Sequence, residues 1–181
     1  MRKAVLSGLF LMLCWSAVAV LASDDFILCK SKYALCTTAK CTPVPEQPDT
    51  VSCSCDVKNS YSAGQQACQD AKETRTGNLK SRYYPVKNYA VCSNSRPWAW
   101  CLDKPCTVDK NNPSKASCAC TLVKDQGAYV VVTDTYSDTT CTTDIWSSAT
   151  VQQITQITDF FKSKDQLKPF PIKVLNSQAQ K

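Results

Sequence analysis

The amino-acid sequence predicts a mainly β, disulfide-rich fold of two tandem six-cysteine modules followed by a C-terminal α-helix. The first reason is a repeat, because Cys36–Cys55 and Cys101–Cys120 both read C-x4-C-x11-C-x-C and lie 65 residues apart. A fixed internal period of this kind indicates a duplicated structural unit. The second reason is composition, since 13 cysteines together with short β-branched runs favour strands held by disulfides.

The first 22 residues have the features of a secretory signal peptide. Arg2 and Lys3 give a positive start, an apolar run extends from Ala4 to Leu21, and Ala22 places a small residue at the expected cleavage site. We therefore expect cleavage near Ala22 and a secreted or periplasmic protein. The membrane is then only the route of export.

Removal of the signal peptide takes Cys14 with it and leaves twelve cysteines, an even number that indicates a disulfide framework in an exported chain. The repeat predicts one pairing scheme for both modules, with every pair inside its own module. Six cysteines allow 15 pairings, and the spacing does not choose among them. We place the modules at residues 23–77 and 78–145, and a helix with an extended tail at 146–181. The expected structural cysteines are Cys29, Cys36, Cys41, Cys53, Cys55, Cys68, Cys92, Cys101, Cys106, Cys118, Cys120 and Cys141.

Within the modules, Thr42–Ser52 and Thr107–Ser117 are predicted to be long loops. The first contains three prolines and the second contains one, and proline removes a backbone donor and fixes φ. Each loop leads into a C-x-C motif on a predicted strand. Residues two apart on a strand share a face, so the two cysteines of one motif are expected to bond to other cysteines.

Two further elements follow in the second module and the tail. Ala128–Thr133 is a β-branched run predicted to be a strand, and it forms a hairpin with Leu122–Val123 around Gly127. A capping-box sequence and apolar residues at helical spacing predict a helix over Ser148–Lys162. The proline-containing segment Leu167–Leu175 is expected to be extended, at a sheet edge or in coil.

The residue inventory excludes several classes of chemistry. The chain has no histidine, which excludes Ser-His-Asp and Cys-His catalysis and histidine-containing zinc sites. It also lacks the glycine-rich nucleotide motifs, so we expect no catalytic residue, no metal and no cofactor. The formal net charge of +6 falls to about +4 without the signal peptide, which is too small to indicate a nucleic-acid partner. The basic segment Lys72–Arg96 is predicted to be a solvated linker.

Aromatic residues give the best candidate ligand-binding positions. Trp98 and Trp100 lie two residues apart, so they share one face of a predicted strand, where they could stack on sugar rings or anchor a protein partner. Tyr33 holds the corresponding position in the first module, and Arg96 lies close to the tryptophans in sequence. The alternative is that the tryptophans form the core of the second module.

These observations predict an exported, non-enzymatic binding protein whose ligand is a protein or a glycan. Two alternatives remain. A secreted protease inhibitor would use a short loop bounded by disulfides, such as Cys36–Cys41 or Cys101–Cys106. A carboxylate-dependent hydrolase or effector would use Asp134, Asp138 and Asp144, of which one would need a raised pKa in a cleft.

We predict that full reduction of the disulfides unfolds the protein. Modules of this size bury little apolar surface, while each disulfide contributes about 2–4 kcal/mol. Far-UV circular dichroism before and after thiol treatment measures the effect. An unchanged spectrum in a sample shown by thiol counting to be fully reduced would contradict the prediction.

Overall fold

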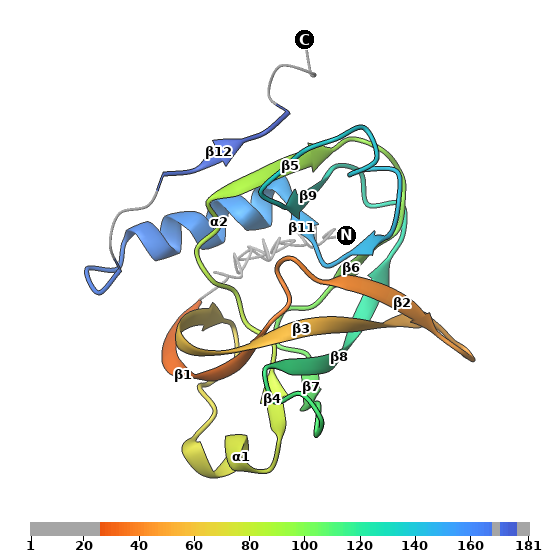
Figure 1. Ribbon diagram of the computed structural model, residues 1–181. Coiled ribbons are helices and arrows are strands. Elements are labelled where there is room, and N and C mark those ends of the chain that lie inside the picture. Colours follow the sequence, from red (N-terminus) through yellow and green to blue (C-terminus); the bar gives the residue numbers. More distant parts are fainter. Residues whose placement is uncertain (1–25, 168–170, 177–181) are drawn as a thin grey trace, which may run out of the picture.

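The computed structural model describes residues 26–167 and 171–176, so the predicted signal peptide lies outside the described residues. The fold is mainly β and consists of an eight-stranded sheet, a four-stranded sheet and a helix that lies along the smaller sheet (Figure 1). Within the described residues, no helix has the length and apolarity needed to cross a membrane.

The eight-stranded sheet contains most of the cysteines. Its strands are β1 (Ile27–Leu35), β2 (Lys40–Val44), β3 (Gln47–Gly64), β4 (Asn78–Lys80), β6 (Trp98–Trp100), β7 (Pro105–Val108), β8 (Lys115–Val123) and β10 (Ile145–Trp146). The spatial order is β10-β2-β3-β8-β7-β4, and β1 and β6 pair with the remaining lengths of β3 and β8. The long strands β3 and β8 therefore run side by side at the centre of the sheet.

The four-stranded sheet carries the helix. Its strands, in spatial order, are β11 (Ala149–Thr150), β9 (Tyr129–Val132), β5 (Asn88–Cys92) and β12 (Lys173–Val174). Helix α2 (Val151–Lys162) buries Ile154, Ile157 and Phe161 in a cluster with Val130 and Ala149. A short amphipathic helix is marginal alone, so this packing accounts for its stability.

Both helices begin at a reciprocal cap. Thr150 and Gln153 at the start of α2 exchange side-chain and backbone hydrogen bonds, as the sequence motif predicts. The shorter helix α1 (Ala71–Arg75) lies in the segment predicted to be a linker, and Asp70 and Glu73 form the same arrangement there. The motif predicted the start of α2, whereas α1 was not predicted from the sequence.

The described tail residues form the edge of the smaller sheet. β12 runs parallel to β5, and the side chain of Asn176 accepts from Val91 N at 3.0 Å and donates to Val91 O at 2.7 Å. The side-chain amide of Asn176 thereby makes the two hydrogen bonds to Val91 that the backbone of a further strand residue would make. β12 lies in the segment Leu167–Leu175 that was predicted to be extended, and residues 168–170 of that segment lie outside the described residues.

The disulfides are nested in the same order in the first cysteine set (Cys29–Cys68) and the second cysteine set (Cys92–Cys141). In each set the first cysteine pairs with the sixth, the second with the fifth and the third with the fourth. The six bonds are Cys29–Cys68, Cys36–Cys55, Cys41–Cys53, Cys92–Cys141, Cys101–Cys120 and Cys106–Cys118. One scheme for both sets, with every pair inside its own set, agrees with the sequence prediction.

Strand register is also the same around the two sets. Cys41 faces Cys53 across β2 and β3, and Cys106 faces Cys118 across β7 and β8. Where β3 meets β8, Cys53 lies opposite Cys118. The strand that follows the first set, β4, pairs with β7, whereas the strand that follows the second set, β10, pairs with β2. An edge strand therefore pairs at the third cysteine of each set, β10 at Cys41 and β4 at Cys106.

Four disulfides form a buried layer on one face of the eight-stranded sheet. Alternate residues of β3 and β8 point to this face, and Cys53, Cys55 and Cys118 are fully buried. Sulfur atoms of different disulfides touch, with Cys53 Sγ 3.4 Å from Cys101 Sγ. Val51 and Leu79 are among the few larger apolar side chains in this cluster. Cystine sulfur therefore fills much of the volume that branched side chains fill in other cores.

The predicted long loops Thr42–Ser52 and Thr107–Ser117 are corrected in part. The first segment is a β-hairpin with a two-residue turn, whereas the second keeps a loop at residues 109–114 between β7 and β8. Pro43 lies in β2 and Pro48 in β3, while Pro45 lies in the tight turn beside Glu46, which has a φ of 62°. Pro43 is tolerated because β10 pairs only with Lys40 and Cys41, which leaves β2 as an edge strand at the proline. Pro43 and Pro48 therefore do not exclude strands, whereas Pro45 and Pro113 lie in turns.

The predicted hairpin around Gly127 is also wrong. Ala128–Thr133 does contain a strand, β9, but β9 pairs with β5 and β11 in the smaller sheet. Its predicted partner, Leu122–Val123, belongs to β8 and pairs with β6. The turn therefore connects two sheets, since β8 pairs with β6 in the larger sheet and β9 pairs with β5 and β11 in the smaller one.

Arg82 and Asp103 form a buried ion pair beside the end of β3. Their side chains are 2% and 6% exposed, and Arg82 Nη1 lies 3.4 Å from Asp103 Oδ1. The guanidinium also donates to Ile27 O at 2.7 Å, Gln66 O at 3.0 Å and Ser62 Oγ at 3.2 Å. Burial lowers the pKa of Arg82, and the Asp103 carboxylate opposes that shift. This cation lies in the segment predicted to be a solvated linker, which corrects that prediction.

The Asp103 carboxylate also fixes the chain after β3. Its Oδ2 atom accepts from Gln65 N at 2.6 Å and Gln66 N at 3.2 Å. A Cβ atom on Gly64 would overlap Asp103 Oδ1 and the Arg82 guanidinium, so this close approach requires glycine. Asp103 itself has a φ of 53°, a conformation that aspartate and asparagine adopt more readily than most residues.

We predict that Asp103→Asn destabilises the protein by about 3–5 kcal/mol, because it leaves the Arg82 charge buried without a counter-charge. Urea denaturation at neutral pH measures the change. Asp144→Asn is the matched control, since Asp144 has the same φ of 53° and pairs with Lys40 at 2.8 Å in an exposed position. The control should unfold at nearly the wild-type midpoint, and equal losses in both variants would contradict the prediction.

Candidate functional site

Trp98 and Trp100 lie on β6 in an aromatic cluster. Trp98 is 3% exposed, and its ring stacks on Tyr129 with centroids 6.3 Å apart and an interplanar angle of 20°. Trp100 is half-buried and lies edge-on to Trp98 at 6.3 Å and to Tyr83 at 6.1 Å. Trp98 is thus a core residue, while part of Trp100 reaches the surface.

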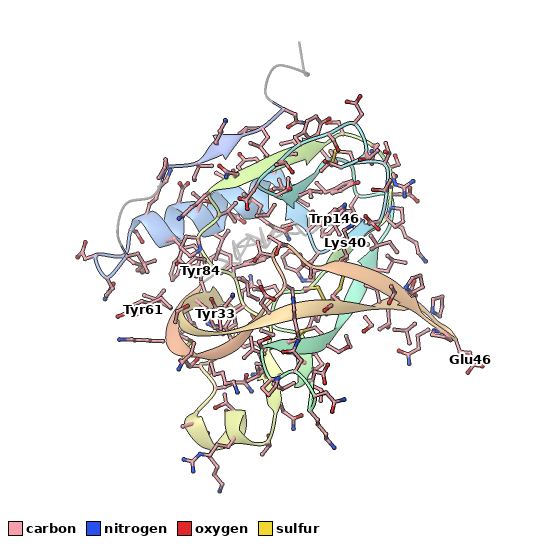
Figure 2. All side chains as sticks on the ribbon, viewed as in Figure 1. Tyr33, Lys40, Glu46, Tyr61, Tyr84 and Trp146 are labelled. Atoms are coloured by element: carbon pink, nitrogen blue, oxygen red, sulfur yellow. A yellow bond between two sulfur atoms is a disulfide. The ribbon has the colours of Figure 1, made fainter. Side chains whose placement is uncertain are left out.

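The other two candidate ligand residues do not join the tryptophans. Tyr33 is fully buried on β1, and its hydroxyl lies 3.3 Å from Ser60 Oγ (Figure 2). Burial raises the pKa of Tyr33 more than the Ser60 hydrogen bond lowers it. Arg96 is exposed in the chain before β6. Tyr33 on β1 faces Lys58 of β3, and Trp98 on β6 faces Val123 of β8 in the equivalent register. Tyr33 and Trp98 therefore hold equivalent positions beside different central strands.

The two tryptophans line a surface hollow of about 410 Å³, here called the tryptophan hollow. Its polar wall comes from the connection after β8 and from the first turn of α2. The principal lining residues are Trp98, Trp100, Lys124, Gln126, Thr150 and Gln153. The hollow therefore combines indole rings with two side-chain amides.

The amides differ in their free hydrogen-bonding capacity. Gln153 Oε1 accepts from Thr150 N at 2.9 Å and Thr150 Oγ1 at 3.1 Å, which leaves its NH₂ group as a donor toward a ligand. Gln126 is exposed. Lys124 Nζ is 3.1 Å from Asp49 Oδ1, so its charge is already paired. The hollow is therefore polar without a strong net charge.

Sequence reasoning identified the tryptophans of this hollow but not its amides. Gln126 follows β8, and Gln153 has a recognised role in the helix cap, so neither carries a local signal of ligand binding. They lie beside the tryptophans only because the chain after β8 and the first turn of α2 line the same hollow.

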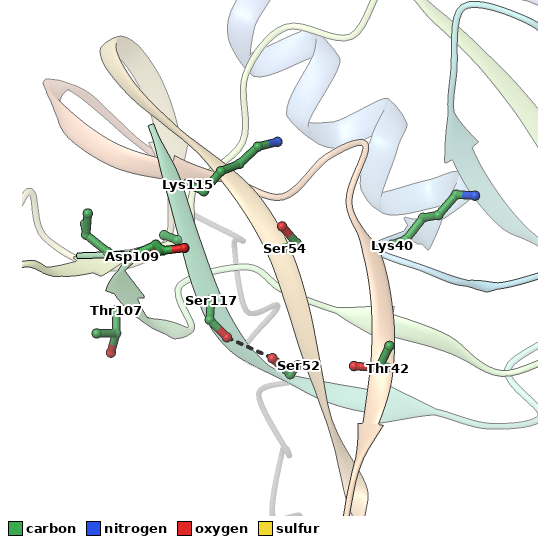
Figure 3. Close-up of a pocket in the computed structure, with 10 residues that line it drawn as sticks. Lys40, Thr42, Ser52, Ser54, Thr107, Asp109, Lys115 and Ser117 are labelled. Carbon is green, nitrogen blue, oxygen red and sulfur yellow. Dashed lines mark hydrogen bonds between the residues drawn. The ribbon is translucent and has the colours of Figure 1, made fainter. Parts of the chain in front are cut away.

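A second surface covers the two hairpins on the face opposite the disulfide layer, and we call it the hydroxyl face (Figure 3). Two hollows of about 410 Å³ and 510 Å³ share Ser52, Thr107 and Ser117 there. Ser52 Oγ and Ser117 Oγ lie 2.8 Å apart across β3 and β8. The segments predicted to be loops therefore do line a concave surface, although most of the lining residues are in strands.

Both lysines at the hydroxyl face are paired. Lys115 Nζ lies 2.7 Å from Asp56 Oδ1, and Lys40 Nζ lies 2.8 Å from Asp144 Oδ2. The hydrogen bond from Lys115 lowers the pKa of Asp56. Apart from Asp109, whose Oδ1 accepts from Asn111 N and Asn112 N, the face consequently presents mainly neutral hydroxyl groups.

The three candidate hydrolase carboxylates have separate surroundings. Asp134 Oδ1 accepts from Asn88 Nδ2 at 3.3 Å beside the smaller sheet, whereas Asp144 pairs with Lys40 beside the larger one. The lysine holds the pKa of Asp144 below its usual value, which is the opposite of the shift a general acid requires. Asp138 is exposed in the loop between them.

The short disulfide-bounded turns are packed against neighbouring chain. In the Cys36–Cys41 turn, Ala39 is 5% exposed and its carbonyl accepts from Ser147 N at 2.9 Å. Leu102 in the Cys101–Cys106 turn is 5% exposed. These turns lack the exposed, extended shape that an inhibitory loop needs.

Three groups of cysteine sulfurs lie close enough to surround a metal ion, but every member is disulfide-bonded. The thiolate is the ligand form of cysteine, so these sulfurs are not available as metal ligands in the oxidised protein. Their proximity reflects the packing of the disulfide layer.

Comparison with protein-family models, with curated proteins and with solved structures found no match.

We predict that Trp98→Ala destabilises the protein by about 3–5 kcal/mol, because it leaves a large cavity beside Tyr129. Arg96→Ala, two residues earlier and exposed, should change stability by no more than about 0.5 kcal/mol. Chemical denaturation followed by circular dichroism measures both. A Trp98→Ala midpoint equal to that of wild type would show that the ring is not part of the core.

Proposed function

We propose that the protein is an exported, non-enzymatic glycan-binding protein and that the tryptophan hollow is its binding site. The observation that supports this most is the half-buried Trp100 ring beside the amides of Gln126 and Gln153 in one concave surface. An aromatic surface packs against the C–H groups of a sugar ring, and amides donate to and accept from its hydroxyls. Neutral polar groups suit an uncharged sugar better than a charged ligand.

Rigid support for the aromatic surface adds to the proposal. Cys101 directly follows Trp100 and is bonded to Cys120 on β8, and Trp100 itself faces Thr121 across the strand pair. Tyr83 and Trp98 restrict the Trp100 ring from two sides. A surface held in this way loses little conformational entropy on binding.

The disulfides indicate an oxidising extracellular or periplasmic environment. We propose that the chain reaches it through the predicted signal peptide, with cleavage near Ala22. Polysaccharides and surface glycans are abundant in such environments.

A protein partner is the alternative ligand, and the hydroxyl face is the surface it would use. That face offers a large concave area over β2, β3, β8 and β7. Protein interfaces are enriched in aromatic residues and arginine and depleted in serine, however, and Ser52, Ser54 and Ser117 dominate here. The composition therefore favours the tryptophan hollow and a glycan.

We also propose that the chain arose by tandem duplication of one six-cysteine unit. The nested disulfides, the equal registers and the contact between Ser52 and Ser117, which lie 65 residues apart, support a pseudo-twofold axis between β3 and β8. In this view β4 and β10 are equivalent strands exchanged between the two units.

Isothermal titration against a panel of soluble neutral and acidic oligosaccharides tests the glycan proposal. We expect at least one neutral oligosaccharide to bind, and Trp100→Ala and Gln126→Ala to weaken that binding about tenfold or more, since each removes a contact worth about 1.4 kcal/mol. Thr107→Ala on the hydroxyl face is the control and should bind as wild type does. If no sugar binds, or if only the control variant loses binding, the proposal is wrong.

A further inference from the structure

A second concavity, separate from the tryptophan hollow, lies where the turn after β1 meets the chain leading into β5 and the end of β9. Its volume is about 190 Å³. Val86 in its wall is 6% exposed and Tyr84 is 41% exposed, so the pocket has a buried floor and an open mouth. We call it the Val132 pocket, and its apolar wall consists of Leu35, Tyr84, Pro85, Val86 and Val132.

The inner end of the Val132 pocket adjoins a cavity of about 10 Å³. The two spaces share Thr37 and Val132 in their linings, and Tyr83 also lines the inner one. Thr37 Oγ1 and the Tyr83 hydroxyl are both buried, and neither has a hydrogen-bond partner among the described residues. A volume of this size holds no more than a single oxygen atom or water.

Unpaired buried hydroxyls are uncommon in folded proteins, and each calls for an explanation. Tyr83 is 8% exposed, and burial, reinforced by Asp103, raises its pKa. The phenol is therefore a neutral O–H group that can donate. Thr37 can donate or accept. Both residues line the inner cavity, so their unpartnered hydroxyls are the candidate partners of one ligand oxygen there.

We propose that the Val132 pocket binds a small, mostly apolar molecule that carries one hydroxyl or carbonyl oxygen. The apolar body lies against Val86 and Val132, and the oxygen reaches the Thr37 and Tyr83 end. Size supports this class, because an apolar cavity of roughly 150 Å³ accommodates a benzene ring. No charged group lines the inner cavity, so an ionised head group has no partner there.

The mouth of the pocket is consistent with a ligand that enters from water. Lys87, Asn88 and Asp134 form a polar rim, and Asn88 Nδ2 donates to Asp134 Oδ1 at 3.3 Å. Asn88 and Asp134 therefore engage one another and leave the apolar wall available. Because Tyr83 lies edge-on to Trp100 at 6.1 Å, occupancy at the inner end should alter tryptophan emission.

Phenol and toluene are the test probes, since they match in size and toluene carries a methyl group where phenol carries the hydroxyl. Two-dimensional amide NMR titration of the full chain measures their affinities. We expect phenol to shift resonances around Thr37 and Val132 and to bind more tightly than toluene. The near-isosteric Thr37→Val should weaken phenol about tenfold and leave toluene unchanged. Tyr83→Phe should have the same selective effect.

Two further variants complete the test. Val132→Trp fills the pocket and should abolish the binding of both probes, whereas Thr107→Val makes the Thr37 substitution on the distant hydroxyl face and should bind as wild type does. Equal affinity of phenol and toluene for wild type would overturn the proposal. So would phenol binding that survives Thr37→Val and Tyr83→Phe unchanged, or probe binding that survives Val132→Trp. Sugar binding at the tryptophan hollow is measured separately, so either proposal can fail alone.

Discussion

The contact between disulfides beneath β3 and β8 is the constraint on which the rest of the structure depends. Alternate residues of these strands are cysteines, so closely packed disulfides cover one face of the central sheet. The opposite face is left to small hydroxyl side chains such as Ser52 and Ser117. With few bulky apolar residues available, covalent bonds replace much of the stability that burial supplies in larger cores.

The two halves of the chain share this layer but differ around it. The buried Arg82–Asp103 pair ties β1, the end of β3 and the turn after β6 together. In the other half, Ser148 occupies the place of Arg82 relative to the matching strands and donates to Val130 O. The two cysteine sets thus share one disulfide framework, and the differences around them create distinct surfaces.

An aromatic row connects two of those surfaces. Each ring contacts the next along the row, from the core beside β9 to the inner end of the Val132 pocket. The order of the rings is Tyr129, Trp98, Trp100 and Tyr83. Half-buried Trp100 lies in the middle of this row and also lines the tryptophan hollow. Rings fixed by neighbours on both sides form a rigid wall, which is the property that recognition of a sugar ring or a small apolar molecule requires.

Local patterns determined what could be read from the sequence alone: the disulfide-rich β class, the equivalence of the two cysteine sets, the strand at Tyr129–Val132 and the capped helix α2. Each depends on neighbours a few residues apart or on a fixed spacing. Tertiary structure alone decided that Thr42–Ser52 is a hairpin with Pro43 at a strand edge, that β9 pairs in another sheet instead of with β8, and that Arg82 is buried. Those outcomes depend on which strands compete for the same edge and on which charges meet at a distance along the chain. The candidate sites follow the same division, because Trp98 and Trp100 were visible as a motif, whereas Gln126, Thr37 and Tyr83 acquire their roles only through packing.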